Sequence, residues 1–132
     1  MFNLSNFFSA GVKNSIELKD NAKFSHAGPY ILLTEKTLID KWHIGDIGSA
    51  EYTISADLNT SNKEIVKCLI TAAINDANVV VYARNATNLS LIDLEVRIND
   101  SYLELYASPT NIKTSNSKLI YTVNYFRNQN PL

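Results

Sequence analysis

Apolar and polar residues alternate along much of the chain from residue 50 onward. Residues 52–58 read Tyr-Thr-Ile-Ser-Ala-Asp-Leu, and residues 93–98 read Asp-Leu-Glu-Val-Arg-Ile. A period of two is the pattern of a β-strand that buries one face and exposes the other, because successive side chains point to opposite sides. The sequence therefore predicts a largely antiparallel β-structure in this part of the chain.

Six strands are expected between residue 50 and the end of the chain, separated by polar turns. They cover residues 52–58, 65–70, 79–82, 94–98, 102–106 and 119–126. The second of these, Ile-Val-Lys-Cys-Leu-Ile, is apolar nearly throughout, which predicts a strand buried on both faces. Short strands at this spacing predict an all-β fold, an antiparallel β-sandwich or a jelly-roll-like domain.

Turn residues divide the chain near residue 48. All four glycines lie in the first 48 residues, and Asn and Asp occupy the later turns, where they tolerate left-handed backbone angles. Asn99-Asp100 is expected to form a tight hairpin between residues 94–98 and 102–106.

We therefore expect two regions in the chain. Residues 1–49 are interpreted as an irregular N-terminal arm or attachment segment, and residues 50–132 as the β-sandwich domain. Within the arm, residues 29–33 are a candidate strand, while residues 4–10 and 35–42 are candidate short helices.

Charge and length exclude some classes of function. Twelve Lys and Arg residues against thirteen Asp and Glu residues leave a net charge of −1, so no nucleic-acid partner is expected. No apolar run is long enough to cross a bilayer, so no membrane partner is expected. The single cysteine, Cys68, lies in the middle of an expected strand, which predicts a buried, unreactive thiol.

The residue patterns contain no recognisable catalytic machinery. His26 and His43 lie in the irregular part, where surface or turn positions are expected, and no glycine-rich phosphate loop is present. Asp93, Glu95, Asp100 and Glu104 flank one hairpin and could bring carboxylates together. The alternation, however, places Asp93 and Glu95 on a solvated face beside Arg97, which indicates ordinary surface charges. No catalytic residue, no metal ligand and no cofactor is expected, so the chain is interpreted as not an enzyme.

Tyrosines on the expected strands allow two interpretations. They could form a platform for a sugar or a protein partner, or they could lie at the margin of the core, which is the more common case. Tyr102 and Tyr106 differ from the rest, because Leu103 and Leu105 would face the core and leave both tyrosines on the outward face with Glu104. These two tyrosines are therefore candidates for assembly contacts.

Further assembly candidates lie in the N-terminal region. The first residues carry four large apolar side chains, which could insert into a neighbouring subunit or pack on their own domain. Trp42 is a further candidate. The N-terminal candidates are Phe2, Leu4, Phe7 and Phe8.

Several phrases of the sequence resemble a known class of viral proteins. They are residues 50–57 (Ala-Glu-Tyr-Thr-Ile-Ser-Ala-Asp), residues 62–69, residues 119–126, and the final Asn-Pro-Leu. Over about residues 42–132 the chain is similar to small virion structural proteins of T4-like tailed phages that infect marine cyanobacteria. That resemblance implies a non-enzymatic virion component of the tail, baseplate, neck, fibre or head surface, a homo-oligomer in contact with other virion structural proteins. The alternative function is a carbohydrate-binding β-sandwich module for host-surface adhesion.

Overall fold

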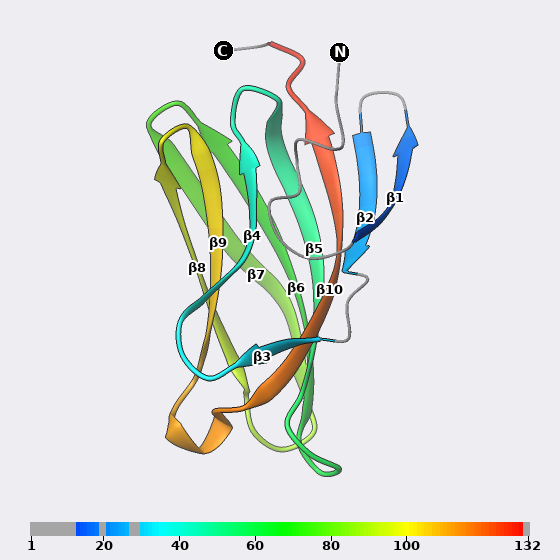
Figure 1. Ribbon diagram of the computed structural model, residues 1–132, viewed down its shortest axis with the longest axis vertical. Coiled ribbons are helices and arrows are strands. Elements are labelled where there is room, and N and C mark those ends of the chain that lie inside the picture. The colour runs from blue at the N-terminus through cyan, green and yellow to red at the C-terminus, as the bar shows by residue number, and fades with distance from the viewer. Residues whose placement is uncertain (1–12, 19–20, 27–29, 131–132) are drawn as a thin grey trace.

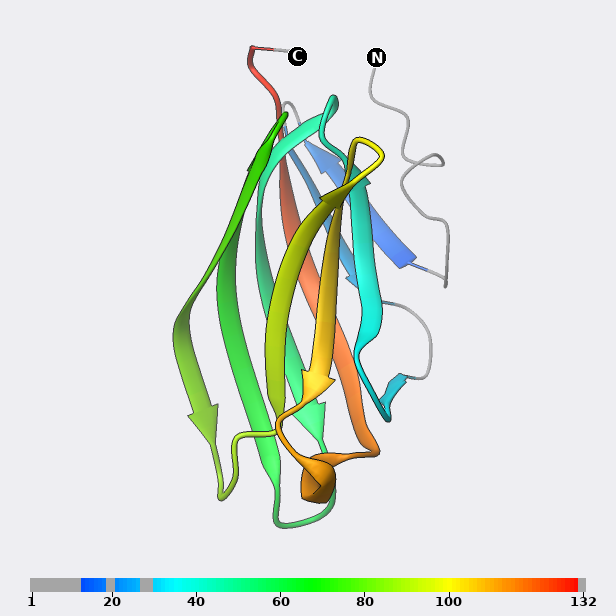
Figure 2. The same ribbon diagram turned by 90° about the vertical axis from the view of Figure 1, so that its left-hand side faces the viewer.

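The chain folds as an all-β sandwich of two antiparallel sheets (Figures 1 and 2). The computed structural model describes residues 13–18, 21–26 and 30–130. Sheet A has the strand order β1-β2-β10-β5-β6-β7, with β3 also paired to β10, and sheet B has the order β4-β9-β8. The predicted antiparallel sandwich is confirmed.

The strands occupy most of the described residues. Their bounds are β1 Lys13–Leu18, β2 Asn21–His26, β3 Ile31–Leu33, β4 Thr37–His43, β5 Ile47–Asp57, β6 Lys63–Ala73, β7 Asp76–Ala86, β8 Ile92–Asn99, β9 Tyr102–Pro109 and β10 Ser117–Arg127. A short 3₁₀ helix, η2, covers Ile112–Thr114 between β9 and β10. All six strands expected after residue 50 are present.

The core lies between the two sheets and follows the predicted alternation. On β10 the buried apolar and aromatic side chains are those of Leu119, Tyr121, Val123 and Tyr125, with exposed or half-buried residues between them. The prediction that residues 65–70 are buried on both faces is wrong, because Ile65 and Leu69 are 44% and 46% exposed. Sheet B packs against one face of sheet A, so the alternate residues of β6 face outward.

The predicted hairpin joins β8 and β9 in sheet B. Asn99 pairs with Tyr102, and the two turn residues Asp100 and Ser101 have φ angles of 55° and 67°. These left-handed angles are those of the two-residue turn that matches strand twist. The hairpin is confirmed, with its turn centred one residue later than the sequence indicated.

The N-terminal part of the chain differs from the predicted arm. Residues 31–33 form β3, as expected, but the segment expected to be helical from residue 35 to 42 contains β4. A β-bulge between Leu38 and Asp40 turns two successive residues, Ile39 and Asp40, into the core. The bulge breaks the period of two, and this irregular spacing of buried residues imitates a helical pattern.

The expected boundary at residue 49 falls inside β5, and β4 is an integral strand of sheet B. Residues from β3 onward therefore contribute to the same sandwich as the later strands. The candidate helix at residues 4–10 and the apolar residues Phe2, Leu4, Phe7 and Phe8 lie outside the described residues.

Candidate interaction surfaces

A buried carboxylate, Asp40 on β4, connects the two sheets. It accepts hydrogen bonds at Oδ2 from the hydroxyl of Tyr52 on β5, at 2.7 Å, and from the hydroxyl of Tyr125 on β10. Trp42 Nε1 donates to the Tyr52 hydroxyl at 3.0 Å, and the Tyr121 hydroxyl donates to the Ile39 carbonyl at 3.2 Å. The Asp40 cluster, as we call Asp40 with Trp42, Tyr52, Tyr121 and Tyr125, thus ties sheet B to sheet A.

Burial is the main cause of the shifted pKa values of the tyrosines in the Asp40 cluster. Burial, followed by the charge of Asp40, raises the pKa of Tyr52, Tyr121 and Tyr125 above the ordinary tyrosine value. The Trp42 side chain is fully buried, which makes it a core residue and not an exposed assembly contact. The buried indole N–H has a hydrogen-bond partner, because it donates to the Tyr52 hydroxyl.

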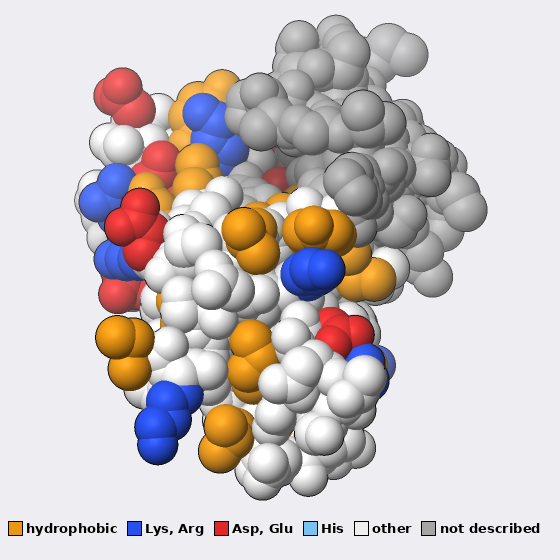
Figure 3. Space-filling model, turned by 60° about the horizontal axis from the view of Figure 1, so that its bottom comes forward, with side chains coloured by type: hydrophobic (Ala, Val, Ile, Leu, Met, Phe, Trp, Pro, Cys, Tyr) orange, Lys and Arg blue, Asp and Glu red, His pale blue; other side chains and the backbone are white. Residues whose placement is uncertain are grey.

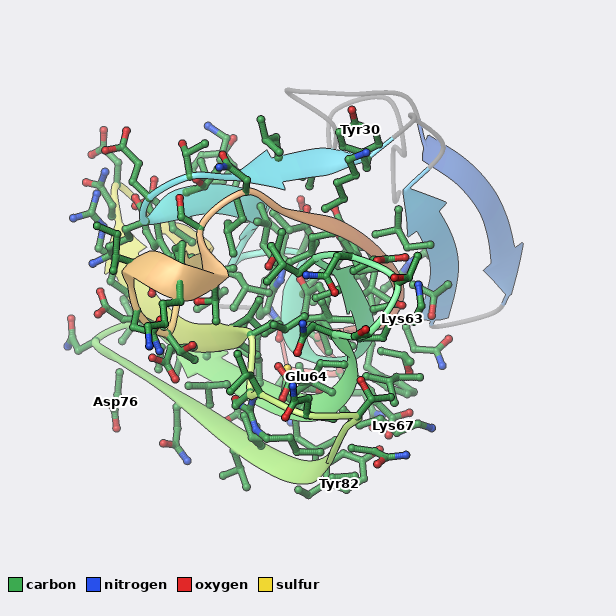
Figure 4. All side chains as sticks on the ribbon, turned by 90° about the horizontal axis from the view of Figure 1, so that it is seen from below. Tyr30, Lys63, Glu64, Lys67, Asp76 and Tyr82 are labelled. Atoms are coloured by element: carbon green, nitrogen blue, oxygen red, sulfur yellow. The ribbon has the colours of Figure 1, made fainter. Side chains whose placement is uncertain are left out.

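A second buried carboxylate, Glu64, holds the connection between the two sheets. Its Oε2 accepts from Arg84 Nη1 at 2.8 Å, and its Oε1 accepts from the backbone N–H groups of Leu91 and Ile92 at 2.9 and 3.2 Å. Arg84 also donates to Ser90 Oγ and to the Ile92 carbonyl. Figure 4 shows Glu64 inside the molecule. This network positions the segment that leads from β7 in sheet A to β8 in sheet B.

The remaining titratable residues occupy structural positions. Cys68 is fully buried, and burial raises the pKa of its thiol to about 12, as expected for an unreactive cysteine. His43 lies at the surface, where its Nδ1 accepts a hydrogen bond from the Gly45 backbone at 3.0 Å. Within the described ranges, no three His, Cys, Asp or Glu side chains are arranged to hold a metal ion. No helix in this part of the chain has the length and apolar character to span a membrane.

The outer face of sheet B carries the predicted tyrosines. Leu103 and Leu105 are fully buried, so Tyr102, Glu104 and Tyr106 share the outward side of β9 as expected. Lys or Arg side chains lie beside Asp or Glu side chains on the left of Figure 3, where Figure 1 places β8 and β9. We call Tyr102, Glu104 and Tyr106, together with Lys36, Lys41 and Arg97, the tyrosine face.

Cations cover the aromatic rings of the tyrosine face. Lys41 Nζ lies 5.0 Å from the centroid of the Tyr102 ring, and Lys36 Nζ and Arg97 Cζ lie 5.1 and 4.9 Å from that of Tyr106. Arg97 also donates to Glu104 at 2.8 Å and to the Tyr106 hydroxyl at 2.7 Å. Burial opposes ionisation of Glu104, yet hydrogen bonds from Arg97 and Tyr106 hold its pKa below the ordinary value. The face is a network of satisfied charges.

The outer face of sheet A is more apolar. Six large side chains from three strands are each between 43% and 48% exposed there: Ile65, Leu69, Val80, Tyr82, Ile120 and Phe126. We call these six residues the apolar outer face. The Tyr82 hydroxyl donates to Glu51 Oε2 at 2.6 Å, which orients its ring across the sheet.

Sequence reasoning missed the apolar outer face because a run of apolar residues predicts burial on both sides. One signal was present: Lys67 lies between Ile65 and Leu69 in the period of two, so all three side chains share one face. A lysine at that position indicates a face in contact with water. Exposed apolar side chains on such a face are typical of protein–protein contact sites.

β7 forms the edge of sheet A beside this face. Within the described residues it pairs only with β6. Its residues from Ala77 to Ala83 are uncharged, and Val80, Val81 and Tyr82 are exposed. Edge strands are usually protected by charged side chains or proline, because their free backbone groups pair readily with other chains. The middle of β7 lacks these protections.

A shallow open depression of about 290 Å³ lies between the β3–β4 turn and η2. Glu35, Lys36, Asn111 and Ile112 are among the residues that line it, and no aromatic ring does so. Its walls combine opposite charges with an exposed isoleucine. The depression has no ring on which a sugar could stack.

Comparisons with known proteins give only distant similarities. No protein-family model matches the chain, and no curated protein matches it. A tailspike protein of Acinetobacter baumannii bacteriophage Fri1, described as a capsular polysaccharide depolymerase, aligns with a TM-score of 0.45 and 15% identity over 86% of this chain and 19% of its own. A tailspike of Acinetobacter phage vB_ApiP_P1 has a TM-score of 0.45 and 12% identity over 93% and 24% of the two chains.

A tailspike protein of Acinetobacter baumannii phage AM24 has a TM-score of 0.39 and 10% identity over 90% of this chain and 27% of that one. The present chain thus spans between 19% and 27% of the length of these proteins.

Proposed function

We propose that the chain is a non-enzymatic structural component of a tailed-phage particle, and that it acts through protein–protein contacts. The observation that carries the proposal is the apolar outer face on sheet A, beside the unprotected edge of β7. The sequence resemblance over residues 42–132 supports a place in the virion. Its partners are other virion structural proteins and further copies of the chain.

The energetics of the apolar outer face are consistent with a contact surface. Burying the exposed half of six large apolar side chains would contribute roughly 4–9 kcal/mol. Association costs about 4–15 kcal/mol in lost freedom. The apolar contacts are therefore of the same order as the cost, and a stable assembly needs additional interactions such as backbone pairing at a sheet edge.

The alternative function, carbohydrate binding for host-surface adhesion, is less well supported by the tyrosine face. Sugar rings stack on the open faces of aromatic side chains. Lys36 and Arg97 lie within about 5 Å of the Tyr106 ring centroid, and Lys41 lies over the Tyr102 ring. A sugar would first have to displace these cations, whereas a protein partner could contact the network as it stands.

Incorporation into particles tests the proposal. A tagged chain is supplied during infection, and purified particles are examined for it by mass spectrometry and immunoelectron microscopy. The wild-type chain is expected at a fixed copy number, and Ile65→Lys is expected to reduce that number because it puts a charge into the apolar outer face. Ile112→Lys is the matched control, since Ile112 is 90% exposed but lies away from that face in η2.

Absence of the wild-type chain from particles contradicts the proposal. Equal incorporation of the Ile65→Lys and Ile112→Lys variants would show that the apolar outer face is not the contact. A glycan array with the purified chain tests the alternative, because specific binding that is lost in Tyr106→Ala would favour the carbohydrate-binding function.

A further inference from the structure

We propose that β7 pairs antiparallel with β7 of a second copy, centred on Val79, so that the two A sheets become one continuous sheet. This inference rests on the assembly function proposed above, for which it names a partner and a contact. In Figure 4, Asp76 and Tyr82 lie along the outer margin of the molecule and bracket the stretch concerned.

The hairpin between β6 and β7 determines which backbone groups of β7 are free. Its turn has two residues, 74 and 75, and Ala73 pairs with Asp76 next to it. A two-residue turn is closed by a hydrogen-bonded pair, and hydrogen-bonded and non-hydrogen-bonded pairs then alternate along the strands. The N–H and C=O groups of Ala77, Val79 and Val81 therefore point away from β6.

A bulge limits this regular stretch. The register between β6 and β7 shifts between Lys67 and Cys68, so that Val81 pairs with Cys68 while Ala83 pairs with Lys67. Residues 77–81 are thus a short, regular edge with three residues whose backbone groups point outward. A bulge of this kind bends the strand and interrupts the regular pairing.

The same edge on a second copy complements this stretch. In an antiparallel register centred on Val79, Ala77 lies opposite Val81 of the second copy, and Val79 lies opposite Val79. On the other side of the sheet, Asn78 lies opposite Val80, and Asp76 lies opposite Tyr82. No like charges meet, and each free N–H at residues 77, 79 and 81 faces a free carbonyl, as in an isologous contact with two-fold symmetry.

The other sheet edges are less suited to this pairing. β8 carries Asp93, Glu95 and Arg97 along its length, and β4 carries a bulge and Lys41. β1, the opposite edge of sheet A, includes Lys13 and Glu17 in its sequence. Charges of this kind oppose the approach of a second strand.

Pairing at β7 would also extend the apolar outer face. Val80 is 48% exposed and Val81 is 38% exposed at the edge. Because β7 would become an interior strand, the two outer faces would join through Val80, which would lie opposite Asn78 of the second copy. Val81 would lie opposite Ala77 on the other side of the joined sheet. The second copy therefore covers apolar surface as well as backbone groups.

Charge variants of one residue test the register. Val79→Lys places two ammonium groups directly opposite each other, and it is expected to weaken self-association at least about tenfold. The matched control is Asn78→Lys, which adds the same charge one residue away but sets it opposite Val80. Mixing the Val79→Lys and Val79→Glu chains is expected to restore a dimer, because the opposed charges are then of opposite sign.

Light scattering after size-exclusion chromatography measures the mass of each variant, and circular dichroism checks its fold. A wild-type chain that stays monomeric from micromolar to millimolar concentration overturns the inference. So does a dimer that Asn78→Lys and Val79→Lys disrupt equally, or a mixture of the two charge variants that does not associate. If a variant fails to fold, hydrogen exchange of the wild-type chain decides, because the amides of residues 77, 79 and 81 should be protected only in the dimer.

The two proposals fail in different ways. A β7-linked dimer that is absent from particles contradicts the virion function and supports the pairing. A chain that is incorporated into particles but shows no self-association through β7 contradicts the pairing and supports the virion function.

Discussion

Replacing Asp40 should cost the sandwich much of its stability. The Asp40 carboxylate accepts hydrogen bonds from the hydroxyls of Tyr52 and Tyr125 in the core. Asp40→Ala deprives both hydroxyls of this acceptor, and a buried donor without its partner costs about 1–3 kcal/mol. The expected loss is therefore about 2–6 kcal/mol of the free energy of unfolding, out of a total of about 5–15 kcal/mol for a domain of ordinary stability.

The Asp40→Asn variant distinguishes the effect of the negative charge from the effect of losing the hydrogen-bond acceptor. The amide keeps one acceptor oxygen but makes neutral hydrogen bonds, which contribute about 1 kcal/mol less than bonds to a charged group. We expect it to lie between the wild type and Asp40→Ala. Asp93→Ala is the control, since Asp93 is exposed on β8 and its replacement should change stability by less than about 0.5 kcal/mol.

Urea denaturation followed by tryptophan fluorescence is the assay. Trp42 is the single tryptophan of the chain, and its Nε1 lies 3.0 Å from the Tyr52 hydroxyl, so the signal reports on the Asp40 cluster itself. A double-mutant cycle between Asp40→Asn and Tyr125→Phe should give a coupling energy of at least about 0.5 kcal/mol. An Asp40→Ala variant within about 1 kcal/mol of the wild type would refute this reasoning.

Four further predictions concern other parts of the fold. Stability should fall as the pH rises above about 10, because burial and the Asp40 charge raise the folded-state pKa of Tyr52, Tyr121 and Tyr125. Each tyrosine that ionises only on unfolding lowers the free energy of unfolding by about 1.4 kcal/mol per pH unit above its unfolded-state pKa, and below that pKa it causes no loss of stability. Urea midpoints that stay flat from about pH 8 to about pH 12 contradict this prediction. Cys68→Ser should lower stability by about 1–3 kcal/mol for a buried hydroxyl, and native Cys68 should react slowly with thiol reagents; rapid labelling would show that the thiol is accessible. Glu64→Ala should cost about 2–6 kcal/mol, because the buried N–H groups of Leu91 and Ile92 lose their acceptor, and it should speed hydrogen exchange at these two residues, whereas unchanged exchange there would mean that the segment is held by other contacts. Ser101→Gly should raise the melting temperature, because glycine adopts the left-handed angle at this position without the roughly 1–2 kcal/mol cost of a side chain; a lower melting temperature would argue against strain in the turn.

Residue patterns that depend on neighbours in the chain were predicted correctly. Alternation along β10 and β9 identified which side chains share a face, including the outward position of Tyr102 and Tyr106. The turn between β8 and β9 and the burial of Cys68 also followed from short stretches of sequence. In each case the strand backbone itself determines the direction of the side chain.

The spacing of residues misled where the backbone departs from a regular strand. The bulge at Ile39 turns two neighbouring residues inward, and the same segment of sequence is compatible with a short helix. The pairing of β4 with β9 in sheet B decides in favour of the strand. It gives the backbone groups of β4 hydrogen-bond partners, whereas a short isolated helix is only marginally stable in water. Trp42 consequently lies in the core.

Alternation in the sequence determined which residues lie together on each side of a strand, and with it the all-β fold. Only the tertiary structure decided which strands are neighbours and which face of sheet A is covered by sheet B. Ile65 and Leu69 are exposed because sheet B covers the opposite face of sheet A, and the order of strands leaves β7 paired only with β6 among the described residues. The acceptor role of Asp40 likewise depends on Tyr125, 85 residues further along the chain. These features arise from contacts between distant strands, and a local period of two carries no information about which strands those are.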